Sequence, residues 1–283
     1  MARFTNQAQL RYGNAVANSN IAVGEILEVL SATKTAIQNT YGANDRITYI
    51  LSVINAGSVP FNGLSVTDDL GAYLSDTEMH TPLTYREGTL KYYSNGILQS
   101  QPNIVTTEPL NITGLSIPAG GNITLIYETI TNAYAPLEVN STITNTAVIN
   151  GGGITQIKAT ETIQADSAPQ LTITKSVSPV PVTENGTLTY TFLIQNMGNT
   201  PADQDLNAVI TDTFDPILSN LTVTYNAETW AEITNYTYDT ATGLFSTVPG
   251  QITVPAASYV QDTQTGVWVV NPGVATLTIS GTI

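Results

Sequence analysis

The stretch LSATKTAIQNTYGANDRITYILSVINAGSVP (30–60) aligns without a gap with LTITKSVSPVPVTENGTLTYTFLIQNMGNTP (171–201). After a three-residue insertion, SVTDDL (65–70) aligns with VITDTF (209–214). A repeat of this length indicates two tandem modules. The identical pairs include Leu30/Leu171, Lys34/Lys175, Tyr49/Tyr190, Asn55/Asn196, Gly57/Gly198 and Pro60/Pro201.

Within each module the apolar runs are short and rich in Thr, Val, Ile and Tyr, and turn residues separate them. SNG (94–96), NGGG (150–153) and ENG (184–186) are typical turn sequences, and little 3.6-residue periodicity is sustained. This pattern predicts an all-β fold of two tandem immunoglobulin-like β-sandwich modules. ADSAPQ (165–170) is predicted to link them.

The composition excludes several classes of protein. The chain of 283 residues has 8 Lys plus Arg against 22 Asp plus Glu, so it lacks the basic face that nucleic acid or acidic lipid requires. It has no cysteine, which excludes disulfides and thiolate metal sites. No run approaches the ~18 apolar residues of a membrane span, and MARFTNQAQL lacks the features of a secretory signal. We expect no cofactor, metal, nucleic-acid partner or membrane insertion.

The two modules end differently. In the first, NITLIYETI (122–130) precedes a further hairpin over residues 141–163. Its match in the second, ATLTISGTI (275–283), is followed by no such hairpin in the given sequence. The second module is therefore expected to lack about two strands.

The missing strands have a match at the start of the chain, where alternate residues align without a gap with the closing hairpin of the first module. We therefore predict a donor hairpin or strand over 1–28, a first module over 29–165, and a second module over 166–283 that is incomplete without a donor. Phe4, Ala8 and Leu10 would be the apolar anchors of the donor. The matching pairs are Phe4/Ile143, Asn6/Asn145, Ala8/Ala147 and Leu10/Ile149.

The predicted donor is too short to reach the second module of its own chain. The nine residues from Ile21 to Leu30 span only ~30 Å at ~3.3 Å per residue, less than the expected length of a sandwich. The exposed core and unpaired edge of an open sandwich are commonly covered by a strand from another chain. A head-to-tail contact of this kind does not close on itself, so it predicts a filament.

Polar residues recur at positions where strand periodicity predicts an inward side chain. Lys34 alternates in phase with Leu30 and Ala32, and Asp68 with Leu64 and Val66. Two interpretations remain open: a hydrogen-bonded pair or wet rim, and a self-formed amide crosslink in which Asp assists the attack of Lys on Asn. The predicted sets are Lys34, Asp68 and Asn145 within the chain, and Lys175, Asp212 and the Asn6 of another chain between subunits.

At these positions the chain resembles the bacterial and archaeal surface repeats called Domain of Unknown Function 11. The resemblance implies an immunoglobulin-like surface protein, and the Lys/Asp/Asn placement is similar to that of crosslinked pilin and adhesin domains. The second module departs from the pattern because it lacks a closing strand. The matching residues are Lys34, Tyr49, Asn55, Gly57, Asp68, Asn145 and Ala147, then Lys175, Tyr190, Asn196, Gly198 and Asp212.

Other chemistry is sparse. His80 is expected in a surface loop, without a serine or cysteine to activate. Asp68–Asp69 and TDTFDP (211–216) lack the spacing of a known calcium loop. Four aromatic residues would suit either the core or a carbohydrate-binding platform: Trp230, Tyr236, Tyr238 and Trp268.

The sequence therefore predicts a structural subunit of a self-assembling filament, extracellular or on a spore surface, with export by a route that it does not show. The partner is a second copy of the chain, and an anchoring protein is unidentified. The alternative is a monomeric surface adhesin or a module that binds carbohydrate or protein. No enzyme is expected beyond a single-turnover crosslinking step.

Overall fold

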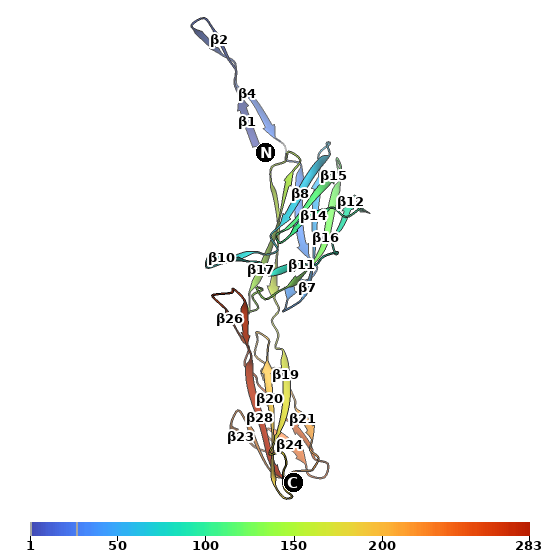
Figure 1. Cartoon of the computed structure of the whole chain (residues 1–283), viewed down its shortest axis with the longest axis vertical. Coiled ribbons are helices and arrows are strands. Elements are labelled where there is room, and N and C mark those ends of the chain that lie inside the picture. The colour runs from blue at the N-terminus through green and yellow to red at the C-terminus, as the bar shows by residue number, and fades with distance from the viewer. Residues whose placement is uncertain (1, 27) are drawn as a thin grey trace.

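The computed structural model describes residues 2–26 and 28–283 and shows an elongated, all-β chain with three parts in line (Figure 1). A thin hairpin projects at one end, the first sandwich (module one) lies in the middle, and the second (module two) lies at the other end. No helix in the described ranges has the length and apolar character to span a bilayer. The predicted fold class is confirmed.

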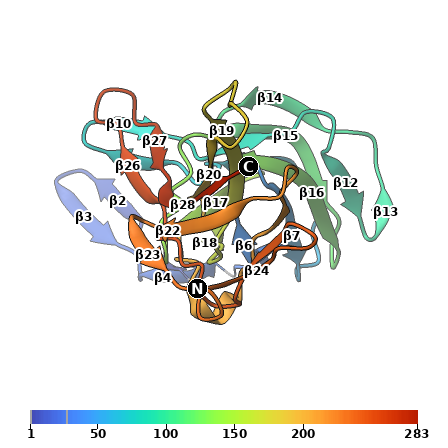
Figure 2. The same cartoon turned by 90° about the horizontal axis from the view of Figure 1, so that it is seen from below.

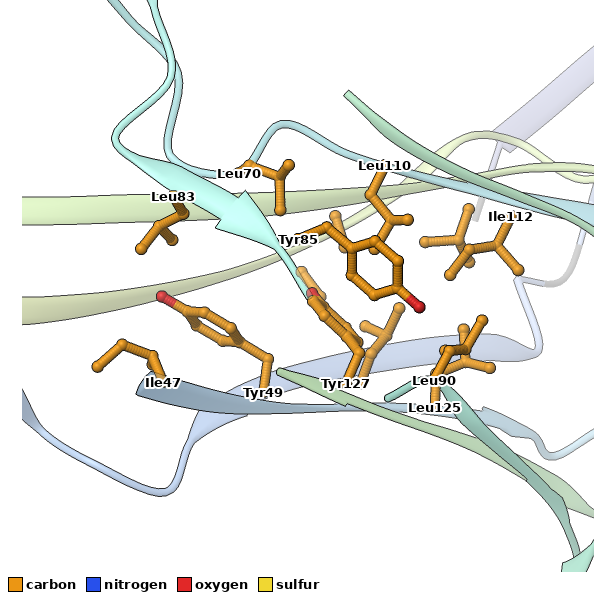
Figure 3. Close-up of a cluster of buried hydrophobic side chains, with 14 of the residues drawn as sticks. Ile47, Tyr49, Leu70, Leu83, Tyr85, Leu90, Leu110, Ile112, Leu125 and Tyr127 are labelled. Atoms are coloured by element: carbon orange, nitrogen blue, oxygen red, sulfur yellow. The ribbon is translucent and has the colours of Figure 1, made fainter. Parts of the chain in front are cut away.

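Module one consists of two sheets that pack face to face. Its strands alternate buried and exposed residues, as in β7 (Arg46–Asn55), where Ile47, Tyr49 and Leu51 are buried. Figure 3 shows part of the resulting core. One sheet contains β13 (Ile97–Leu98), β12 (Lys91–Ser94), β16 (Asn122–Thr131), β7, β5 (Leu30–Ala36) and β11 (Leu83–Tyr85); the other contains β14 (Asn103–Thr107), β15 (Leu110–Ile117), β8 (Phe61–Asp68), β17 (Thr142–Gly151), β18 (Ile157–Ala165) and β6 (Thr40–Tyr41).

Module two has the same plan with fewer strands. Among the described residues, no strand stands where β17 and β18 stand in module one, so its second sheet is only three strands wide. A single 3₁₀ turn, η1 (Gln204–Leu206), is its one helical element in this part of the chain. The strands are β19 (Leu171–Ser178), β20 (Thr187–Asn196), β28 (Gly273–Thr282), β22 (Ser219–Tyr225) and β23 (Glu228–Trp230) in one sheet, and β21 (Thr211–Thr213), β25 (Leu244–Thr247) and β24 (Tyr236–Asp239) in the other.

The projecting hairpin forms two successive ladders. β1 (Ala2–Asn6) pairs with β4 (Ala22–Ile26), and β2 (Gln9–Tyr12) pairs with β3 (Ala15–Asn18). Gly13 adopts a φ of 55° in the turn at the tip, a conformation that costs glycine little. The hairpin leaves large apolar side chains in solvent, with Phe4 54% and Leu10 64% exposed.

The two modules meet through an extra hairpin of module two, β26 (Ser258–Gln261) and β27 (Trp268–Asn271), beside β9 (Tyr73–Ser75) and β10 (Glu78–His80) of module one (Figure 2). The backbone amide of Trp268 donates to the Ala133 carbonyl at 2.9 Å. The Asn199 amide group donates to the carbonyls of Leu137 and Asp166 at 2.8 and 2.6 Å. Hydrogen bonds from the β26–β27 hairpin and from the Asn199 side chain thus hold module two against module one and the linker.

His80 is not in a surface loop, so that expectation is wrong. It lies in β10, half-buried, and its ring stacks on Tyr134 with centroids 5.1 Å apart. Gly266 of module two lies so close that a Cβ there would meet the imidazole at 2.1 Å. His80 is therefore part of the packing at the joint between the modules.

Candidate functional site

The core of module one contains an ion pair. Lys34 on β5 and Asp68 at the end of β8 face each other across the two sheets, with the Lys34 Nζ 2.6 Å from Asp68 Oδ2. Lys34 is 4% exposed and Asp68 1%. An ion pair so deep in the core costs desolvation energy that a packed apolar pair avoids, so its net contribution to stability is small.

Two further groups hold the Asp68 carboxylate. The Leu70 amide donates to Oδ1 at 3.0 Å, and the Tyr127 hydroxyl on β16 donates to Oδ2. Burial raises the pKa of Tyr127 well above its usual value, so the phenol stays protonated and acts as a donor. Tyr127 was not singled out from the sequence, although Ile123, Leu125 and Tyr127 alternate in the inward phase.

Asn145 on β17 lies at the same depth. It is fully buried, and neither polar atom of its carboxamide has a hydrogen-bond partner among the described residues. A buried polar group without a partner costs about 1–3 kcal/mol, so natural cores contain few. Strand β17 lies directly beside β8, with Ala147 opposite Asp68, which brings Asn145 to the Asp68 end of the sheet.

Tyr49 on β7 lies near both the lysine and the asparagine. Lys34 Nζ is 4.9 Å from the centre of its ring. Burial raises the pKa of Tyr49, and the neighbouring Asn145 side chain only partly offsets the rise. The structure thus buries Lys34, Asp68 and Asn145 in one core, and Tyr49 lies near both the lysine and the asparagine.

The charge state of Lys34 is set by two opposing effects. Burial lowers the pKa of the amine, and the adjacent Asp68 raises it; the net direction is downward. A lowered pKa increases the fraction of neutral amine, which is the nucleophilic form. Module one thus contains a buried lysine in contact with a carboxyl group, and a buried carboxamide on the strand next to that of Asp68.

Module two repeats the pair in an open setting. Lys175 on β19 contacts Asp212 on β21, but their side chains are 39% and 18% exposed. The Lys175 Nζ lies 4.4 Å from the centre of the Tyr190 ring, as Lys34 lies over Tyr49. The apolar residues in phase with Lys175 are also uncovered: Leu171 is 37% exposed, Ile173 51% and Val177 39%.

The open edge of module two lies at β21. In module one β8 is flanked by β15 and β17, whereas β21 pairs only with β25 in the described part of the chain. In module one the Asp69 amide donates to the Thr146 carbonyl of β17 at 3.0 Å. In module two the corresponding amide, that of Thr213, donates instead to the Asp212 side chain at 2.9 Å. In module two the Asp212 side chain therefore accepts from an amide whose counterpart in module one donates to the neighbouring strand.

The remaining predicted site residues lie elsewhere. Asn6 is exposed on β1, and module one lies between β1 and β19, the strand that carries Lys175 (Figure 1). Phe4, Ala8 and Leu10 are exposed on the same hairpin. The structure therefore buries all members of the first set in module one, and the members of the second set lie apart within the single chain.

The alternative sites receive no support from the geometry. Tyr236 stacks on Phe245 in the core, while Trp268 donates its indole N–H to Tyr73 at the joint, so the four aromatic residues do not form one platform. Asp69 already accepts the amides of Gly71 and Thr146. In the described ranges, no three acidic or histidine residues cluster as metal ligands.

No protein-family model and no curated protein matches the chain. Among solved structures, the collagen-binding subdomain of the Enterococcus faecalis surface protein ACE aligns at 11% identity with a TM-score of 0.33, over 50% of this chain and 99% of that one. The RrgB pilus backbone of Streptococcus pneumoniae aligns at 11% identity with a TM-score of 0.36, over 86% and 55%. Likeness at this level concerns strand arrangement and carries no inference about function, so the resemblance to Domain of Unknown Function 11 stays a prediction.

Proposed function

We propose that the chain is the structural subunit of an extracellular or spore-surface filament, joined head to tail by donation of the N-terminal hairpin into module two of the neighbouring subunit. One observation carries the proposal: the same chain has an exposed N-terminal hairpin and a sheet edge at β21, here called the acceptor edge. The hairpin aligns with the closing hairpin of module one, and module two aligns with the rest of module one. In the alignment that places Phe4 on Ile143, the pairing Phe4↔Gly24 repeats Ile143↔Ile163, and Asn6↔Ala22 repeats Asn145↔Glu161.

The docked hairpin would bury apolar surface on both partners. Phe4 and Leu10 would cover Ile173 and Val177, all of which are exposed in the single chain. Burial of such side chains stabilises by about 1.5–3 kcal/mol each. The hairpin and the acceptor lie at opposite ends of the elongated chain, so the contact repeats along a line (Figure 1).

The same docking would place Asn6 where Asn145 stands in module one. In each set the lysine nitrogen would attack the side-chain carbonyl carbon of asparagine and form the new C–N bond. The old bond to the amide nitrogen would break, and the aspartate carboxyl group would relay a proton from the amine to the departing ammonia. Module one would form this bond within the chain and module two between chains, which gives a covalent filament.

Deletion of residues 1–28 tests the assembly. We expect module one to fold and the protein to remain monodisperse by electron microscopy, whereas the full chain gives fibres one subunit wide. A peptide of residues 1–28 should shorten wild-type fibres because it occupies the open module. Fibres from the truncated protein, or monodisperse particles from the full chain, would contradict the proposal, and the latter would favour the adhesin alternative.

A further inference from the structure

Module one contains a short parallel pairing that closes its second sheet. The end of β18 pairs with β6, with Gln164 opposite Thr40 and Ala165 opposite Tyr41. The amide of Gln164 donates to the Asn39 carbonyl at 3.0 Å, and the amide of Asp166 donates to the Tyr41 carbonyl at 2.8 Å. In both bonds the segment 39–41 supplies the carbonyl, and the N–H group comes from the end of β18 or from the residue that follows it.

Module two has the corresponding segment without its partner strand. In the gapless alignment of the two modules, Asn39 and Tyr41 correspond to Val180 and Val182. Val182 packs against the core of module two, as Tyr41 does in module one, while Val180 is 77% exposed. Among the described residues, no strand pairs with this segment.

The sequence of this segment restricts what it can pair with. Residues 179 and 181 are prolines, so two of its backbone positions have no N–H group. A segment of this kind cannot donate the backbone hydrogen bonds of a regular β-ladder. Its prolines therefore disfavour nonspecific strand pairing at this sheet edge. The carbonyls of Val180 and Val182, which correspond to the two that act as acceptors in module one, remain.

Strand β4 presents an N–H group in the required phase. In the alignment of the donor with the closing hairpin, Glu25 corresponds to Gln164, and the pairing Arg3↔Glu25 repeats Thr142↔Gln164. The Gln164 amide points away from β17 toward the segment 39–41. Because amides alternate in direction along a strand, the matching register directs the Glu25 amide away from β1.

We propose that β4 of a second copy adds in parallel to residues 180–182, with the Glu25 amide donating to the Val180 carbonyl. This inference rests on the proposed function and extends it: the acceptor holds both strands of the donor, β1 along β21 and the end of β4 along the proline-flanked segment. The donor therefore enters as an intact hairpin and closes two separate edges. The partner that fits is a second copy of this chain.

Glu25→Pro removes the N–H group in question, and Val23→Pro is its matched control. The Val23 amide points in the same direction, but its counterpart Thr162 lies outside the β6 pairing, which includes only Gln164 and Ala165. Both variants are made with Asn6→Ala, so that docking is noncovalent and dissociation can be measured. We expect fibres with Glu25→Pro to dissociate about three- to tenfold faster than fibres with Val23→Pro, the effect of one backbone hydrogen bond.

Amide hydrogen exchange of Glu25 in fibres with an intact Glu25 gives a second measurement that does not depend on the proline variants. We expect the Glu25 amide to be protected in fibres and to exchange freely in monomers. Equal dissociation rates for the two variants, together with free exchange at Glu25, would overturn the inference while leaving fibre formation intact. Absence of fibres from the wild-type chain would overturn the proposed function itself.

Discussion

Module one and module two carry the same lysine and aspartate on equivalent strands, but only module one covers them. In module one the pair is buried, β17 lies directly beside the strand of Asp68, and Asn145 is buried on β17. In module two β19 is exposed along its whole length, and Lys175 is partly in solvent. The comparison teaches that the closing hairpin both completes the sheet and excludes solvent from the lysine and the aspartate.

The two pairs also differ in what holds the aspartate. Tyr127 is opposite Tyr49 in the ladder of module one, and Ile279 is opposite Tyr190 in that of module two. The second module thus has no phenol at this position. In module two the Tyr190 ring stacks instead on Phe214, with ring centroids 4.9 Å apart.

The largest expected effect comes from Asn6→Ala. Wild-type fibres should survive boiling in detergent and reductant as multimers on a gel, and digestion should yield a branched peptide joining Lys175 to Asn6. Asn6→Ala should still polymerise, because Phe4, Ala8 and Leu10 remain, but its fibres should dissolve to monomers. Asn14→Ala, at the exposed tip of the same hairpin, is the control and should behave as wild type. Wild-type fibres that dissolve under this treatment would refute the interchain bond.

Asp68→Ala should have the next largest effect. Intact mass of the wild-type chain truncated before residue 29 should show the loss of one ammonia, and the variant should retain it. Its free energy of unfolding should fall by at least about 3 kcal/mol, because a tie between distant strands is lost and Lys34 is left unpaired in the core. Asp212→Ala in the same truncated chain is the control and should keep the mass loss. An unreduced mass in folded wild-type protein would leave only the hydrogen-bonded pair.

Tyr127→Phe should affect only module one. Without the phenol, the Asp68 carboxyl group loses a donor that fixes its orientation, and the crosslink within the chain should form about tenfold more slowly, as for one lost charge-assisted hydrogen bond. The crosslink between chains should form at the wild-type rate, since Ile279 stands in the corresponding place. Time-resolved mass spectrometry during refolding measures the first rate, and gel analysis of fibres measures the second. An equal slowing of both would show that the two sites do not differ in this way.

The smallest expected effect lies at the joint between the modules. The Tyr73 hydroxyl donates to the Tyr134 carbonyl and accepts from Gln261 and Trp268. Tyr73→Phe should lower stability by about 1 kcal/mol while β26 and β27 lose protection from hydrogen exchange. Tyr93→Phe, on the far strand β12, is a matched control that should leave this protection unchanged.

The sequence predicted the features that depend on local patterns. Strand periodicity placed Lys34, Asp68 and Asn145 on inward faces, and the structure buries all three. The repeat predicted two sandwiches joined by a linker over residues 165–170. In the structure β18 ends at Ala165 and β19 begins at Leu171.

Features that depend on tertiary pairing were not predicted. The alignment of 275–283 with 122–130 is one residue out of phase, because pairing in the sheets places Ile279, and not Ser280, at the position of Tyr127. The joint could not be foreseen either, since β26 and β27 have no counterpart in the part of module one that the structure describes. His80 lies in its packing only because that hairpin covers β10.

The clamped joint has a mechanical consequence. Inside the subunit, Asn199 and the β26–β27 hairpin fasten one module to the other. At the junction between subunits, the residue that aligns with Asn199 is Ser58, and the described part of module one has no such hairpin. A filament of these subunits would therefore be a chain of stiff rods with softer hinges, and its curvature would be concentrated at one point per subunit.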